Sequence, residues 1–281
     1  MAGIYIHIPF CKQSCHYCNF HFSTSTKNKD KVLDAIENEI KQKGQVTHEA
    51  ISTIYFGGGT PSILDVNEIN SIIKRIYKEF NVESEAEITI EANPDDLNKE
   101  KIINLSLTEI NRLSIGVQSF IDKELKIMNR AHDSKKALNS IEISKKYFDN
   151  ISIDLMYGVP DSTIESWAYN LDIVSQYDIK HISSYALTLE PKTALESFVR
   201  KLIIDMPDEG LVYEQYNLIN EKLEPLGFIN YEVCSFAKEN FFSKNNSAYW
   251  LRKKYIGIGP SAHSFDGKSR SWNISNNKKY I

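Results

Sequence analysis

The sequence predicts an α/β protein in which strands and helices alternate around a parallel sheet. Six short apolar runs rich in β-branched residues recur within residues 1–190, and amphipathic helical patterns fill the intervals between them. Polar, cysteine-rich or glycine-rich motifs lie at the end of these runs, where parallel α/β folds bind ligands. Both an open sheet and a barrel satisfy this pattern.

The first two strand–helix units are expected as follows. A strand over residues 4–8 leads into a cysteine-rich loop, a helix opens at 25–27 and ends at Gly44, and a second strand over 51–56 precedes a helix over 66–79. The apolar stripes of the two helices are Val32, Leu33, Ile36 and Ile40, and Ile69, Ile72, Ile73 and Ile76.

Four more strands and a C-terminal extension complete the expected fold. The strands are 86–91, 112–116, 151–156 and 181–186, with helices near 134–147 and 162–175. A further helix is expected near 208–224, with short strands near 228–236 and 255–258. We therefore expect a core over residues 1–190 and an extension over residues 191–281 that packs against it.

Composition narrows the functional classes. The chain has 281 residues, 42% hydrophobic and 25% charged, which is typical of a globular protein with a large core. A net charge of −4 argues against nucleic-acid binding, and no apolar run approaches the roughly 18 residues of a membrane span. The chain begins almost directly with a strand and shows no presequence, which favours the cytoplasm; peripheral contact with a membrane stays open.

The most informative motif is a group of three cysteines within eight residues, Cys11, Cys15 and Cys18. Three thiolates suit a soft metal, whereas a structural zinc or a fully ligated cluster normally takes four protein ligands. Three ligands on a [4Fe–4S] cluster would leave one iron open for another molecule. The alternatives are unrelated core thiols or a zinc site completed by His16, His21 or a distant residue.

Unusual polar residues follow the other strands as well. Gly57–Gly59 let the backbone approach a ligand closely, or form only a tight turn. Glu91 and Asp154 interrupt apolar strands and could accept hydrogen bonds from ribose hydroxyls, or pair with a buried lysine or arginine. Arg130 could face a ligand carboxylate or lie on the surface, and Gln118 could cap a turn. We expect six features to converge on one rim: the cysteine loop, the triple glycine, Glu91, Gln118, Asp154 and Tyr185.

These motifs resemble a known family. The spacing Cys11-x3-Cys15-x-Tyr17-Cys18 is similar to the cluster motif of radical S-adenosylmethionine (radical SAM) enzymes. Motifs elsewhere between residues 4 and 265 resemble the branch that contains the oxygen-independent coproporphyrinogen III oxidases. They are Ile6-His7-Ile8-Pro9-Phe10-Cys11, Gly57-Gly58-Gly59-Thr60-Pro61, Glu91-Ala92-Asn93-Pro94, Ser114-Ile115-Gly116-Val117-Gln118-Ser119-Phe120 and Asp154-Leu155-Met156-Tyr157-Gly158-Val159-Pro160.

The resemblance implies a partial (β/α)6 barrel with a C-terminal α/β extension. A [4Fe–4S] cluster would bind Cys11, Cys15 and Cys18, and SAM would chelate the open iron and be cleaved to methionine and a 5′-deoxyadenosyl radical. By motif match, the SAM contacts would be Tyr5, Tyr17, Gly58, Gly59, Thr60, Glu91, Gln118, Arg130, Asp154, Ala186 and His263.

Two departures from the oxidases point to their HemW-type relatives, which are heme chaperones. Phe20 stands where the oxidases carry a fourth cysteine, and the long N-terminal arm is absent. The resemblance then implies SAM, heme or a porphyrinogen, a heme-acceptor protein and an electron donor as partners. The alternatives are an active coproporphyrinogen III oxidase, which decarboxylates its substrate, and a metal-stabilised fold without SAM chemistry.

Two features of the C-terminal part depart from the HemW-type pattern. Asn245 stands where that group often has histidine, a proposed heme ligand; His263, His132 or Cys234 could substitute for it, although each such residue is more often structural. Relatives of this kind usually continue into a small helical or winged-helix domain. Because the sequence stops at Ile281, we expect a chain truncated before that domain.

Overall fold

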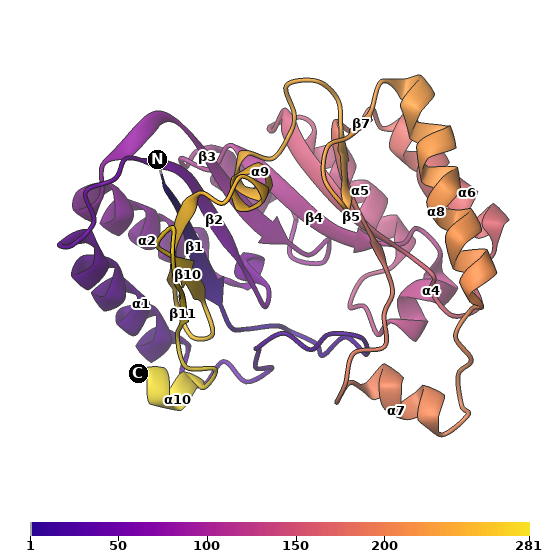
Figure 1. The fold of residues 1–281 in the computed structure, drawn as a ribbon, viewed down its shortest axis with the longest axis horizontal. Helices are drawn as coiled ribbons and strands as arrows, with labels where there is room; N and C mark the ends of the chain where they lie inside the picture. Colours follow the sequence, from indigo (N-terminus) through magenta and orange to yellow (C-terminus); the bar gives the residue numbers. More distant parts are fainter. Residues whose placement is uncertain (1) are drawn as a thin grey trace.

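The computed structural model describes residues 2–281 and contains one curved sheet of eleven strands (Figure 1). The strand order is β11-β10-β9-β1-β2-β3-β4-β5-β6-β8-β7. Its centre consists of six parallel strands in sequence order: β1 (Ala2–Ile8), β2 (Ile51–Gly58), β3 (Val82–Ala92), β4 (Arg112–Gln118), β5 (Asn150–Tyr157) and β6 (His181–Ala186). All six strands expected from the sequence are confirmed.

Helices connect the parallel strands and cover the outer face of the sheet (Figure 1). They are α1 (Lys29–Gly44), α2 (Val66–Glu79), α3 (Lys99–Ser106), α4 (Asp122–Ile127), α5 (Ser134–Ser144) and α6 (Ile164–Gln176), with the 3₁₀ turn η1 (Pro61–Ile63) before α2. The apolar stripes predicted for α1 and α2 are buried in the main core, which joins these helices to the strands. Burial of one apolar face fixes each helix on the sheet.

The C-terminal third extends the sheet at both edges. β7 (Ile229–Asn230) and β8 (Ser235–Ala237) add antiparallel strands beside β6, whereas β9 (Lys254–Ile258) runs parallel to β1. The other elements of the C-terminal third are α7 (Ala194–Arg200), α8 (Glu209–Leu223), η2 (Glu224–Leu226), α9 (Lys244–Trp250), β10 (His263–Phe265), β11 (Arg270–Trp272) and α10 (Asn277–Tyr280). The sheet stays open, which confirms the predicted partial (β/α)6 barrel with an α/β extension.

Several elements differ from those expected, mainly because they depend on contacts with distant parts of the chain. α1 begins at Lys29 rather than at residues 25–27, and β3 starts earlier because Val82 pairs with Ile51 of β2. The short helices α7 and α9 carry too little periodic pattern for prediction and depend on distant contacts. In α9, for example, Glu87 of β3 accepts hydrogen bonds from two backbone N–H groups of the first turn.

The described helices lack the properties of membrane-spanning helices. None of those formed by residues 2–281 combines the length and the apolar character that crossing a membrane requires.

Candidate functional site

A cavity of about 500 Å³ opens at the carboxyl ends of the parallel strands. The features predicted to converge on one rim do so: the cysteine loop, Gly58 and Gly59 of the triple glycine, Glu91, Gln118, Asp154 and Tyr185 all contribute to its wall. Among the proposed cofactor contacts, the wall includes Cys11, Cys15, Cys18, Tyr17, Gly58, Gly59, Thr60, Glu91, Gln118, Arg130, Asp154 and Ala186. Parallel topology explains the convergence, because these strand ends share one edge.

The cysteine loop is fixed at both sides by backbone hydrogen bonds. The N–H of Cys11 donates to the carbonyl of Ser23 at 3.1 Å, and the N–H of Thr60 donates to the carbonyl of Phe10 at 2.7 Å. The Thr60 hydroxyl also lies 3.4 Å from the Cys11 sulfur. Farther along the loop, His16 bonds through its backbone to Met128 and to Leu195 of α7. The loop therefore holds its thiols in the wall of the cavity, at the carboxyl ends of the strands.

The triple glycine allows β2 to approach this loop. A Cβ atom at Gly59 would lie 2.7 Å from the carbonyl oxygen of Phe10 and 2.9 Å from that of Ile8. Gly58 has a φ of +111°, and a Cβ atom there would lie 2.7 Å from the ring of His7. The glycines are thus required by packing against β1 and the cysteine loop, and Gly58 and Gly59 also line the cavity.

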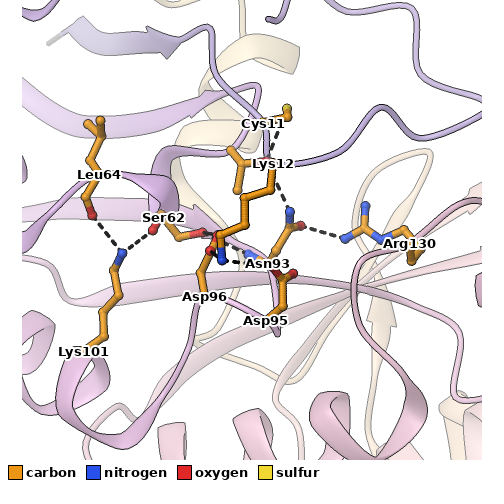
Figure 2. Close-up of polar contacts among 10 residues, drawn as sticks. Cys11, Lys12, Ser62, Leu64, Asn93, Asp95, Asp96, Lys101 and Arg130 are labelled. Carbon is orange, nitrogen blue, oxygen red and sulfur yellow. Dashed lines mark hydrogen bonds and ion pairs between the residues drawn. The ribbon is translucent and has the colours of Figure 1, made fainter. Parts of the chain in front are cut away.

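A polar network below the loop connects it to the ends of β2 and β3 (Figure 2). Lys12 forms ion pairs with Asp95, at 3.1 Å, and with Asp96. Asp96 accepts a hydrogen bond of 2.6 Å from the Ser62 hydroxyl, and the ammonium of Lys101 donates to the carbonyls of Ser62 and Leu64. These contacts position the cysteine loop against the sheet.

Arg130 joins the cysteine loop to two strand ends and is not the surface arginine considered as an alternative. Its Nη1 lies 3.4 Å from the Cys15 sulfur and 3.3 Å from the Tyr17 hydroxyl. Its Nη2 donates to Asn93 Oδ1 and to the Gly116 carbonyl, both at 2.7 Å. The Nε atom of Arg130 is buried without a partner. The guanidinium therefore places positive charge beside a thiol of the cavity.

Two carboxyl groups line the cavity: Glu91 on β3 and Asp154 on β5, with β4 between the two strands. Burial raises the pKa of Glu91 to about 7, even though Tyr55 donates a 2.8 Å hydrogen bond to it, and nearby Asp154 adds to the rise. Burial likewise raises the pKa of Asp154 to about 6, against a hydrogen bond from Ser114. Buried Arg112 lowers both pKa values by less than burial raises them. A cationic ligand in the cavity would favour the charged carboxylates.

The donor set fits an iron–sulfur cluster. Cys11, Cys15 and Cys18 are free thiols that line the same cavity. Within residues 2–281, no three histidine, cysteine or acidic side chains gather tightly enough to hold one metal ion. A [4Fe–4S] cluster does not require the three thiols to lie so close together, because each thiolate binds a different iron rather than one shared ion.

Two of the predicted SAM contacts, Tyr5 and His263, line a neighbouring cavity instead of this one. Tyr5 stacks on the ring of Tyr55, and the Tyr55 hydroxyl donates to Glu91. Tyr5 is therefore connected to the main cavity through Tyr55. Gln118 does line the main cavity, with a left-handed backbone (φ +67°) at a register shift between β4 and β5.

Asn93 is a polar residue of the site that the sequence analysis did not assign a role. Its side chain accepts a hydrogen bond from Arg130 and donates one of 3.2 Å to the Thr60 hydroxyl. Two signals could have identified it: its place in the motif Glu91-Ala92-Asn93-Pro94, and its position directly after β3, at the same edge of the sheet as the other predicted groups.

Comparison with known proteins agrees with this geometry. The model of the radical SAM superfamily matches residues 5–172. The chain is 36% identical to the heme chaperone HemW of Bacillus subtilis (strain 168), over all of this chain and 75% of that protein. It is also 36% identical to HemW of Buchnera aphidicola subsp. Schizaphis graminum, over 93% of this chain and 69% of that protein.

A solved structure extends the likeness to three dimensions. Coproporphyrinogen III oxidase (HemN) from Escherichia coli, described as a radical SAM enzyme, superposes with a TM-score of 0.86. The match covers 99% of this chain and 68% of that chain, with 25% sequence identity. The chain therefore belongs to the radical SAM superfamily. Within it, the relatives place the chain in the coproporphyrinogen III oxidase-like branch that includes the HemW proteins.

Proposed function

We propose that this protein is a heme chaperone that carries a [4Fe–4S] cluster, binds SAM and passes heme to an acceptor protein. The observation that carries the proposal is the 36% identity to HemW over the whole chain, combined with a phenylalanine at position 20. Phe20 lies at the wall of the main cavity and is 70% exposed. Its ring offers an apolar surface where the resembling oxidases carry a cysteine.

In this proposal the cluster is held by Cys11, Cys15 and Cys18. When bound, it would supply the electron that cleaves SAM, and its open iron would take the amino and carboxylate groups of SAM. Arg130 would stabilise the thiolate of Cys15 by a charge-assisted hydrogen bond. Conversion of the thiols to thiolates on metal binding releases protons, so cluster assembly is favoured at higher pH.

The remaining residues of the cavity would hold the rest of SAM. Glu91 and Asp154 present carboxyl oxygens to its polar groups, and the positive sulfonium compensates for the burial of their charge. Thr60 and Gln118 add polar groups at the ends of β2 and β4.

The second candidate function is decarboxylation of coproporphyrinogen III. The superposition on the Escherichia coli oxidase, with its TM-score of 0.86, favours it. Against it stands Phe20 in place of the fourth cysteine.

One anaerobic experiment separates the two functions. The protein is reconstituted with iron and sulfide and given SAM, a reductant and coproporphyrinogen III, and porphyrin products and 5′-deoxyadenosine are followed together. We expect no protoporphyrinogen, followed by stoichiometric binding when heme is added. Protoporphyrinogen formed over many turnovers would identify an oxidase and overturn the chaperone proposal. The same proposal includes a heme-acceptor protein and an electron donor as partners, and a cytoplasmic location for the protein.

A further inference from the structure

A second cavity, of about 300 Å³, lies beside the main one and is lined by rings. We call it the histidine–aromatic cavity. It is lined by Tyr5, His7, Phe20, His21, Tyr249, Tyr255, Ser261 and His263. Phe20 lines both cavities, so it forms part of the boundary between them. A space bordered almost entirely by aromatic and imidazole rings suits a flat, apolar ligand.

The three histidines of this cavity have different hydrogen bonds. His7 uses both ring nitrogens: Nε2 lies 2.9 Å from the carbonyl of His21 and donates to it, so Nδ1 accepts from the Tyr5 hydroxyl at 3.2 Å. Burial lowers the pKa of His7 to about 4, which keeps the ring neutral. His7 is therefore a structural residue with no lone pair to offer a metal.

His21 has the arrangement of a metal-ligating histidine. Its Nε2 lies 2.7 Å from the side-chain oxygen of Asn277, which can only accept a hydrogen bond. The proton is thus on Nε2, and Nδ1 keeps a free lone pair. Ligating histidines commonly donate their second ring nitrogen to an oxygen in this way, because the bond fixes both tautomer and orientation.

His263 is the second imidazole available to a ligand. It is exposed at the start of β10 and stacks on Trp272, with ring centroids 5.9 Å apart. Trp272 is itself 68% exposed, so aromatic surface continues beyond the cavity. A macrocycle larger than the cavity could be inserted in part and covered by these rings.

The other ligands considered from the sequence are placed differently. Asn245 is the buried residue in the first turn of α9, and its amide oxygen lies 3.4 Å from the Thr53 hydroxyl. His132 is buried and its Nε2 donates to the carbonyl of Val117. Cys234 is not among the residues that line either cavity. Of the replacements for the missing histidine at position 245, only His263 faces a cavity fit for a flat ligand.

We propose that the histidine–aromatic cavity is the heme site, and that His21 or His263 ligates the heme iron. This inference rests on the proposed heme-chaperone function and assigns that function to a surface separate from the SAM cavity. Tyr5, Tyr249 and Tyr255 contact the face of the macrocycle, and Phe20 separates its edge from the SAM cavity. Neutral imidazole is a suitable ligand for heme iron.

The test is a hemin titration of the cluster-reconstituted chain, followed by the Soret band and by electron paramagnetic resonance. The variants are His21→Ala and His263→Ala. His48→Ala is the matched control, because His48 is an exposed histidine before β2 that lines neither cavity. We expect one equivalent of heme to bind to the wild type and to His48→Ala. At least one of the other two variants should bind about tenfold or more weakly, with a changed spin state.

A rescue experiment separates ligation from folding. Replacement of the responsible histidine by glycine should abolish the histidine-type spectrum, and free imidazole should restore it if the ring acts as a ligand. Unchanged affinity and spectrum in both His21→Ala and His263→Ala, with stoichiometric binding by the wild type, would overturn this site while leaving the chaperone proposal intact. Absence of stoichiometric binding by the wild type would instead reject the proposed function.

Discussion

Replacement of Glu91 by glutamine should make the ligand-free protein more stable and its SAM complex weaker. Burial raises the pKa of Glu91 from 4.5 to about 7. In the unfolded chain the carboxyl ionises near pH 4.5, whereas in the native protein it holds its proton up to about pH 7. Native stability from this group therefore falls as the pH rises through that window.

The rise in the pKa of Glu91 sets an upper limit on how much the substitution can change the free energy of unfolding. It corresponds to at most about 3 kcal/mol against the charged carboxylate above pH 7. Glu91→Gln removes this cost and retains an oxygen to accept from Tyr55. We expect equal stability of variant and wild type below about pH 4.5, and a more stable variant near pH 8, by about 1 to 3 kcal/mol.

Urea unfolding of the ligand-free chain at several pH values measures the stability, and calorimetry measures SAM binding to the reconstituted protein. SAM affinity should fall by about tenfold or more in Glu91→Gln, because a charge-assisted contact is lost. A variant that is less stable than the wild type at pH 8, or that binds SAM equally well, would refute this account of Glu91.

Further substitutions test other parts of the site. Cys15→Ser should lower bound iron to near zero after reconstitution, whereas Cys234→Ser should leave it unchanged; colorimetric iron analysis distinguishes them. Gly59→Ala brings a methyl group within 2.7 Å of the Phe10 carbonyl, so both iron content and melting temperature should fall. Arg130→Met removes four polar contacts and should lower cluster retention in chelator challenge. Glu87→Ala leaves the backbone N–H groups of Lys244 and Asn245 in the first turn of α9 without their acceptor, and urea unfolding should show a loss of about 1 to 3 kcal/mol in the free energy of unfolding. Except for the Cys234→Ser control, a variant that behaves like the wild type would contradict the contact that its substitution tests.

The sequence predicted the fold where periodicity is strong and failed where structure depends on distant contacts. The buried stripe of α2 was visible as isoleucines at helical spacing, and each parallel strand appeared as an apolar run. α7 and α9 were not predictable, because they are short and are fixed by the backbone of His16 and by Glu87 of β3.

The same division applies to the site. Topology alone placed Glu91 and Asp154 at one rim, because parallel strand ends meet there. The sequence could not show that Arg130 would reach back to Cys15, since 115 residues separate them. It also could not show that His21 and His263 share a cavity, because β10 approaches the cysteine loop only through the extension beside β1.

The most direct test of the central claim is the electron paramagnetic resonance spectrum of the reduced, reconstituted protein with and without SAM. We predict about four irons per chain and a cluster signal that shifts on addition of SAM, because the open iron gains its ligand. Both the iron and the signal should be absent in Cys15→Ser. A cluster signal that SAM leaves unchanged, or iron retained without Cys15, would contradict the assignment of this cavity as a radical SAM site.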